Sequence, residues 1–288
     1  MFAMDICIRW VVALRPEAQA LIDRFGLVSK KNSSDAFPVW VSEDGGMEVI
    51  VSGPGRVLSA AATGYLGGQT QGPPRCFGWI NFGIAGSGRS DYGRSFIGNR
   101  ICAAHSANAF YPPLVLPKTK AIDRRGIQTV DSPTTDYPKD GTLVEMEAAG
   151  FYPVASRLAS SEFCQVLKVV SDDPFNDINS INKSQVINHC HNALDESSPW
   201  LDDFKALLGE EARRTADPEG FAELVSSYHF SVTQQLQLRR LLQQRQALGI
   251  RNVRTYRHGS DGNDCLRELR EELKRAQLVA RAGDDEYV

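Results

Sequence analysis

The feature that most constrains the fold is a repeated succession of a short apolar segment, a turn with glycine or proline, and a segment of helical spacing. The apolar side chains of 6–13 do not alternate with polar ones, which is typical of a strand covered on both faces. Pro16 then suits the first turn of a helix that ends at Gly26. The same succession returns at 48–66, across Gly53-Pro54-Gly55. It predicts an α/β fold with ligands bound beyond the carboxyl ends of the strands.

Later segments extend this pattern. A third strand is expected at 76–81, followed by a loop with glycines at 83, 86 and 88. Residues 101–141 are rich in Pro, Asp and Thr, which indicates strands at 113–116 and 127–130 joined by long loops. Helical spacing from 146 to 158 precedes another buried strand at 163–170, and a helix is expected at 178–194. The sequence therefore predicts helices packed around a central sheet.

The composition changes after Ser197, where glycine becomes scarce and Leu, Gln, Arg and Glu dominate. Apolar residues at helical spacing continue through 221–248 and 266–278. We expect a first domain at 1–197 and a helical C-terminal extension at 198–288. The six arginines between Arg239 and His258 form a basic patch, interpreted as a solvated face or as partners of internal salt bridges.

Composition excludes several classes of protein. The chain has 288 residues, 42% of them hydrophobic, so it can bury a substantial core and is not disordered. Its six cysteines are too scattered for a disulfide scaffold, and we expect a reducing, cytoplasmic setting. A net charge of -3 does not favour nucleic acid or an anionic membrane as partner, and no apolar run is long enough for a membrane span. A small neutral ligand is the expected partner.

Asp172 is the first candidate for chemistry, because it follows the buried strand at 163–170 and stands beside Ser171. Partial burial at the carboxyl end of a strand raises the pKa of a carboxyl group and makes it a proton donor. The alternative is an ordinary turn or capping aspartate.

Two glutamates are further candidates. Glu147 lies at a strand-to-helix junction, where its carboxylate can accept hydrogen bonds from vicinal hydroxyls beside the apolar side chain of Met146. Glu17 lies one turn into its helix. For both, the alternative is a first-turn acid that interacts with the helix dipole.

Glycine loops and the histidine pair add less. Gly53-Pro54-Gly55 lacks the third glycine of a dinucleotide site, because Leu58 stands in its place. The 83–88 loop has backbone N–H groups that can face a sugar, a base or an anion. His189-Cys190-His191 does not predict a metal site, because adjacent positions on a helix point in different directions. We expect neither a metal nor a cofactor.

Five blocks in order resemble the nucleoside phosphorylase/nucleosidase superfamily, and most of all its methylthioadenosine/S-adenosylhomocysteine nucleosidase branch. They are Ala13-Leu14-Arg15-Pro16-Glu17, Ser52-Gly53-Pro54-Gly55-Arg56-Val57, Ile80-Asn81-Phe82-Gly83-Ile84-Ala85-Gly86, Val144-Glu145-Met146-Glu147-Ala148-Ala149 and Val170-Ser171-Asp172. The first and third blocks also resemble futalosine hydrolases. The resemblance covers about residues 5–194. It implies a three-layer α/β sandwich with a central twisted mixed sheet, assembled as a homodimer or higher oligomer, that cleaves the N-glycosidic bond of a purine-type nucleoside.

The resemblance also implies residue roles. Asp172 would protonate the departing base, and Glu17 would activate the attacking water. Glu147 would hold the ribose hydroxyls with Met146 against the sugar. Ala85, Gly86 and Ser171 would complete the substrate site. A ribosyl-cation-like transition state needs these two things, negative charge near the sugar and a proton for the base.

Departures from the family bear on the nucleophile and the base. Asn81 and Ile84 stand near the places where phosphorolytic relatives carry phosphate-binding Arg and Ser, so hydrolysis is favoured over phosphorolysis. Phosphorolysis through Arg56, Arg89 or Arg94 is the alternative within enzymes. A nucleoside-binding regulatory protein that acts through its C-terminal helices is the alternative of another class. The segment 126–141 is short where the family places its base-contacting residues, so the preferred base stays open.

Overall fold

The computed structural model describes residues 6–30, 36–70, 76–113, 122–250 and 261–284. The chain divides into two compact units, residues 1–214 and 215–288. Each unit has its own hydrophobic core among the described residues.

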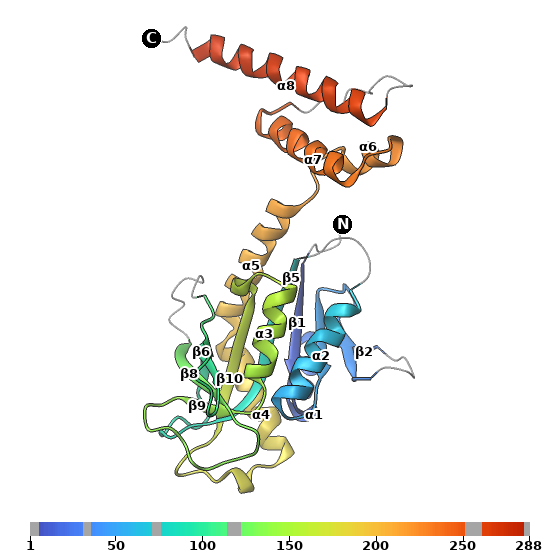
Figure 1. The fold of residues 1–288 in the computed structure, drawn as a ribbon. Coiled ribbons are helices and arrows are strands. Elements are labelled where there is room, and N and C mark those ends of the chain that lie inside the picture. The colour runs from blue at the N-terminus through green and yellow to red at the C-terminus, as the bar shows by residue number, and fades with distance from the viewer. Residues whose placement is uncertain (1–5, 31–35, 71–75, 114–121, 251–260, 285–288) are drawn as a thin grey trace. The chain divides into compact units, whose positions relative to one another are not determined.

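The first unit is built on one mixed sheet (Figure 1). Its central strands β1 (Ile6–Val12), β4 (Met47–Val51), β5 (Cys76–Gly86) and β10 (Cys164–Asp172) run parallel to one another. The other described strands are β2 (Val28–Ser29), β3 (Val39–Val41), β6 (Ser95–Ala103), β7 (Ala109–Phe110), β8 (Asp123–Thr129) and β9 (Leu143–Glu145). The order is β10-β6-β8-β9-β5-β1-β4-β3-β2, with β7 beside β6.

The pairings close a ring within this sheet. β10 pairs with both β6 and β5, while β9 pairs with both β8 and β5. Gly86, the last residue of β5, is the partner of both Val144 in β9 and Asp172 in β10. The ring therefore brings the ends of β5, β9 and β10 to one place, although their residues are far apart in the sequence.

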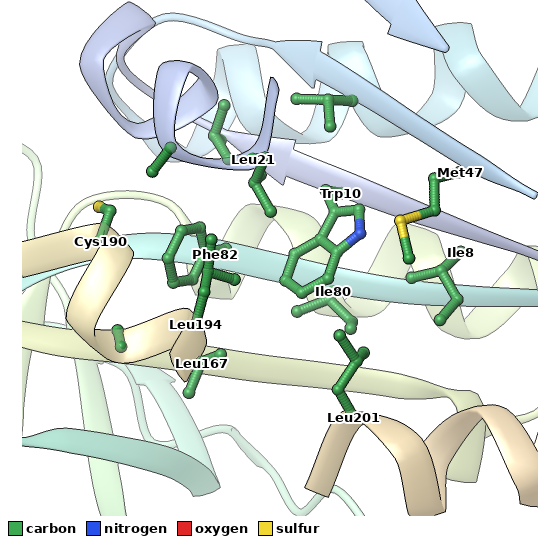
Figure 2. Close-up of a cluster of buried hydrophobic side chains, with 14 of the residues drawn as sticks. Ile8, Trp10, Leu21, Met47, Ile80, Phe82, Leu167, Cys190, Leu194 and Leu201 are labelled. Carbon is green, nitrogen blue, oxygen red and sulfur yellow. The ribbon is translucent and has the colours of Figure 1, made fainter. Parts of the chain in front are cut away.

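Helices cover both faces of the sheet. On one face, α1 (Arg15–Phe25), α4 (Lys183–Glu196) and α5 (Ser198–Thr215) enclose a core that contains Trp10, Phe82 and Leu194 (Figure 2). On the other face lie α2 (Arg56–Gly68) and α3 (Ala148–Leu158), packed on Trp79 and Val166. The predicted three-layer arrangement is confirmed, and strand β1 is buried along its length from Cys7.

The division at 214 differs from the expected boundary at 197, and the reason is the packing of α5. Trp200, Phe204 and Leu208 on this helix belong to the same core as β1 and β5. Phe204 lies on Gly78 of β5, where an added Cβ would approach its ring to 2.6 Å. The polar composition of the exposed side of α5 resembles that of the C-terminal helices, although its apolar side belongs to the first unit.

Two expected elements have different limits. The glycine loop predicted at 83–88 is largely strand, because β5 stays paired with β10 from Trp79 to Gly86, and β6 rather than a helix follows. The helix expected from Ile178 begins at Lys183, because the Asn182 side chain caps it by accepting a hydrogen bond from Gln185 N. The predicted strand at 113–116 lies almost entirely outside the described residues.

The second unit consists of α6 (Phe221–Ser227), α7 (Val232–Ala247) and α8 (Gly262–Asp284), joined by Phe221, Leu238, Leu242 and Leu269. Two arginines of the basic patch form ion pairs within this unit. Arg239 pairs with Asp217 at 2.5 Å and Arg245 pairs with Glu272 at 3.4 Å. Arg251, Arg254 and Arg257 lie outside the described residues. In the part of the chain that the structure describes, no helix has the length and apolarity needed to cross a membrane.

We predict that a chain ending at residue 214 folds cooperatively, while a chain ending at 197 is strongly destabilised. The shorter chain loses Trp200, Leu201, Phe204 and Leu208, which are almost fully buried. Burial of each such side chain contributes about 1.5–3 kcal/mol, so their combined loss approaches the whole stability of a typical domain. Urea unfolding followed by far-UV circular dichroism measures the difference. Equal stability of the two fragments would contradict this prediction.

Candidate active site

A cavity of about 240 Å³ lies where β1, β5, β9 and β10 end. Its wall is mostly apolar, with a few carboxyl and hydroxyl groups pointing at the same space, as is usual for small-molecule sites. The residues around it are Ala13, Leu14, Glu17, Pro54, Ile84, Ala85, Gly86, Val130, Pro133, Thr134, Tyr137, Val144, Glu145, Met146, Glu147, Ser171, Asp172 and Ile178.

The structure brings all of the predicted site residues to this cavity. Glu17 comes from α1, while Ala85 and Gly86 end β5. The junction of β9 and α3 supplies Met146 and Glu147, and the end of β10 supplies Ser171 and Asp172. Their placement is thus established for the described chain, whereas their chemical roles stay predictions.

Glu17 is held in place by backbone N–H groups from two elements. Its Oε2 accepts hydrogen bonds from the N–H groups of Ala13 and Leu14, at 2.9 and 2.8 Å. Its Oε1 accepts one from Ile84 at 3.0 Å. Burial raises the pKa of Glu17 to about 7, while nearby Lys168 opposes the rise and Glu147 adds to it. A carboxyl group with this pKa can take up or release a proton near neutral pH, and these hydrogen bonds fix its position.

Glu147 lines the cavity and contacts the turn that precedes α2. Its Oε1 accepts a hydrogen bond from Gly55 N at 2.9 Å, which fastens the glycine-proline-glycine turn to α3. Burial raises the pKa of Glu147, although Lys168 lowers it and Glu145 raises it further. Gly55 has a φ of 103°, a conformation that favours glycine, and it lets the backbone present this N–H group.

Lys168 is a site residue that sequence reasoning missed. Its side chain is 1% exposed, and its Nζ lies 2.9 Å from Glu145 Oε2 and 3.7 Å from Glu147 Oε2. Burial lowers the pKa of Lys168, but the charges of Glu145, Glu147 and Glu17 outweigh burial and raise it overall. The signal in the sequence was a lone lysine within the otherwise apolar strand at 163–170, because a buried lysine needs ionised partners.

Glu145 connects Lys168 to the start of α3. Besides the ion pair, its Oε2 accepts hydrogen bonds from the N–H groups of Glu147 and Ala148, both at 2.9 Å. Its Oε1 accepts one from the Thr129 hydroxyl. This fully bonded carboxylate positions the backbone of Glu147, and its own acceptor capacity is largely used.

Asp172 is held by two hydroxyl groups instead of by the lysine. Ser171 Oγ donates to Asp172 Oδ1 at 2.6 Å, and the hydroxyl of Tyr137 donates to Oδ2. Tyr137 belongs to the segment between β8 and β9, in which the sequence left the base-contacting residues open. Val130, Pro133 and Thr134 of the same segment also line the cavity.

Two glycines make the convergence possible. A Cβ at residue 83 would collide with the carboxyl group of Glu17, and one at residue 86 would collide with the Tyr137 ring and with Asp172 Oδ2. Both glycines lie in β5, and their lack of a side chain leaves room for Glu17, Tyr137 and Asp172. Across the described residues, no group of three or more His, Cys, Asp or Glu is arranged to hold a metal ion.

Comparison with known proteins shows the fold. No protein-family model and no curated sequence matches the chain. Among solved structures, 5'-methylthioadenosine/S-adenosylhomocysteine nucleosidase from Helicobacter pylori is 18% identical with a TM-score of 0.53, covering 69% of this chain and 98% of its own. The 5'-methylthioadenosine nucleosidase of Arabidopsis thaliana is 16% identical with a TM-score of 0.55, covering 69% and 96%. Futalosine hydrolase of Helicobacter pylori is 17% identical with a TM-score of 0.52, covering 69% and 98%. The resemblance stated from the sequence is therefore confirmed for the fold.

We predict that Lys168→Met destabilises the protein by about 3–5 kcal/mol at pH 8, because it leaves buried carboxylates without their cation. The loss is expected to be smaller at pH 5.5. The raised pKa values of Glu17 and Glu147 allow these groups to become protonated there, which removes the uncompensated charge. Urea unfolding at the two pH values measures this, with the exposed Lys183→Met as control. An equal loss at both pH values would contradict the assigned charge cluster.

Proposed function

We propose that this protein hydrolyses the N-glycosidic bond of a purine-type nucleoside. The observation that supports this most is the convergence of Glu17, Glu147 and Asp172 on one mostly apolar cavity. These groups lie on three different elements, and each is positioned by hydrogen bonds that do not consume all of its acceptor capacity. Solved structures of similar fold include nucleosidases and a futalosine hydrolase, which supports the same class of reaction.

In the proposed reaction, the bond from the anomeric carbon to the base nitrogen breaks and its electron pair stays with the base. Asp172 gives its proton to a ring nitrogen of the leaving base, so that the base departs neutral. The sugar carbon becomes positively charged and then bonds to the oxygen of a water molecule. Glu17 takes the proton that this water loses. The negative charges of the cavity stabilise the sugar cation as it develops.

Glu147 is proposed to bind the sugar hydroxyls. Its carboxylate is fixed by Gly55 N and faces the cavity together with the half-buried side chain of Met146. Vicinal hydroxyls donate well to a carboxylate in such a water-poor place. Met146 offers a flexible apolar surface for the ring of the sugar. Ala85, Gly86 and Ser171 line the adjoining wall and are proposed to contact the substrate.

Water is the favoured nucleophile over phosphate. The three arginines considered for phosphate binding do not line the cavity. Arg56 pairs with Asp131 at 2.9 Å, Arg94 pairs with Asp123 at 2.7 Å, and Arg89 donates to the Asp140 carbonyl at 2.7 Å. A cavity wall with carboxylates and without these cations repels a phosphate dianion.

The expected homodimer or higher oligomer and the cytoplasmic setting stay predictions. Support for self-association comes from α2, whose N-terminal residues Val57 and Leu58 are 75% and 44% exposed. Apolar side chains exposed at the end of a helix can be buried in a protein interface.

We predict that the protein releases free base and free sugar from at least one of methylthioadenosine, adenosylhomocysteine, inosine and futalosine, without phosphate. Asp172→Asn should lower kcat at least about 100-fold, because it removes the general acid. Asp136→Asn is the matched control, since Asp136 is exposed and does not line the cavity. Chromatography of the products with and without phosphate measures the outcome. Absence of cleavage under both conditions would overturn the proposal, and strict phosphate dependence would decide for a phosphorylase.

We predict that kcat/KM falls as the pH is lowered through about 7, the value to which burial raises the pKa of Glu17. A general base works only when it is ionised, so activity is present above this pKa and is lost below it. Glu17→Gln should remove this acidic limb and lower kcat by about 100-fold or more. The pH dependence of initial rates tests the assignment. An unchanged acidic limb in Glu17→Gln would assign the base to another group.

A further inference from the structure

Two hydroxyl groups from different parts of the chain donate hydrogen bonds to the carboxyl group of Asp172. Ser171, its chain neighbour, donates to Oδ1. Tyr137, 35 residues away in the segment 130–142, donates to Oδ2. The ring of Tyr137 lies so close to Gly86 that a side chain at that position would collide with it. Tyr137 is therefore held by the contact of its ring with Gly86 and by the hydrogen bond of its hydroxyl to Asp172. All three residues line the cavity.

The Tyr137 hydroxyl stays protonated across the working range of pH. Burial raises the pKa of Tyr137 above its ordinary value, and the hydrogen bond to Asp172 raises it further. The charges of Asp177 and Asp173 act in the same direction. Tyr137 is thus a neutral donor that does not itself supply the proton for a leaving group.

We propose that Tyr137 is a positioning residue for Asp172: its hydroxyl fixes the carboxyl group at the cavity wall and stabilises the negative charge that develops there as the proton leaves. This inference rests on the proposed function, in which Asp172 is the proton donor. It adds to that function a residue that neither binds the sugar nor transfers a proton.

The physical reason lies in the direction of the hydrogen bond. A hydroxyl that donates to a carboxyl oxygen stabilises the ionised form more than the protonated form. As Asp172 releases its proton, negative charge develops on its oxygens and the hydrogen bond from Tyr137 becomes charge-assisted. The interaction is stronger in the transition state than in the ground state, which is the condition for it to increase kcat.

Other ionisable groups around Asp172 and Tyr137 contribute charge to their surroundings. On the cavity side these are Glu17 of α1 and Glu145 and Glu147 at the β9–α3 junction, which interact with Lys168 of β10, a residue that does not line the cavity. On the outer side they are Asp173 and Asp177. The substitution Tyr137→Phe changes none of these charges, so its effect on Asp172 reports the lost hydroxyl.

The test compares wild type with Tyr137→Phe, which keeps the ring on Gly86 and removes only the hydroxyl. We expect kcat to fall by about 10-fold or more, the worth of one hydrogen bond to a charged group, with little change in KM. A fall in kcat with KM unchanged distinguishes positioning of Asp172 from damage to the cavity itself, which would change KM as well. Tyr92→Phe is the matched control, because Tyr92 packs against His189 and does not line the cavity.

A second readout does not depend on turnover. The carbon-13 signal of the Asp172 carboxyl group, assigned with Asp172→Asn, can be recorded by NMR at one fixed pH in wild type and Tyr137→Phe. We expect its chemical shift to change in Tyr137→Phe and not in Tyr92→Phe, because only the first variant removes a hydrogen bond to this group. The effects of Tyr137→Phe and Ser171→Ala on the signal are expected to be non-additive, because both donors act on one carboxyl group. An unchanged signal together with an unchanged kcat would overturn the proposal. If wild type cleaves no nucleoside, the proposed function fails, while the NMR comparison still shows whether Tyr137 holds Asp172.

Discussion

The rest of the site depends on the ion pairs that the buried ammonium group of Lys168 forms with nearby carboxylates. A cation enclosed in a sheet is tolerated only where carboxylates offset the loss of hydration. Glu145 supplies the close contact, at 2.9 Å, while Glu147 and Glu17 contribute at longer range. One lysine in β10 thus ties together acids from α1, from β9 and from the start of α3. Glu145 and Glu147 also line the cavity, so the ion pairs with Lys168 help to position its polar groups.

The acids differ in what they are free to do. Glu145 is saturated by Lys168, Thr129 and the first N–H groups of α3, so it acts as a structural support. Glu17 accepts only backbone hydrogen bonds and carries a pKa of about 7, which suits proton exchange. The oxygens of Asp172 accept hydrogen bonds from neutral hydroxyls. The neighbouring carboxyl groups therefore differ in the donors that hold them: Lys168, a hydroxyl and backbone groups for Glu145, backbone N–H groups for Glu17, and hydroxyl groups for Asp172.

The sequence predicts the parts of this arrangement that depend on local pattern. The apolar run of β1, the small residues of α2 and the position of Asp172 after a buried strand can each be read from the residues themselves. Lys168 and Tyr137 were not identified as site residues from the sequence, for different reasons. Lys168 interrupts an apolar strand, but its partners lie on other elements, and only the sheet order shows that they meet. Tyr137 lies in an irregular segment, where neither spacing nor propensity fixes the direction of a side chain. The end of the first unit at 214 was not predicted, because α5 shares the polar composition of the helices after it.

The glycines of β5 show how a recognised motif can serve a purpose other than the expected one. Their pattern suggested a loop whose N–H groups face a ligand, but residues 83 and 86 lie in a paired strand. One N–H group of this stretch, that of Ile84, is used within the protein to hold Glu17. The missing side chains matter more, since Gly83 leaves space for the carboxyl group of Glu17 and Gly86 leaves space for Tyr137 and Asp172. A strand without side chains at these two points allows a base candidate and an acid candidate to approach the same sheet edge from different elements.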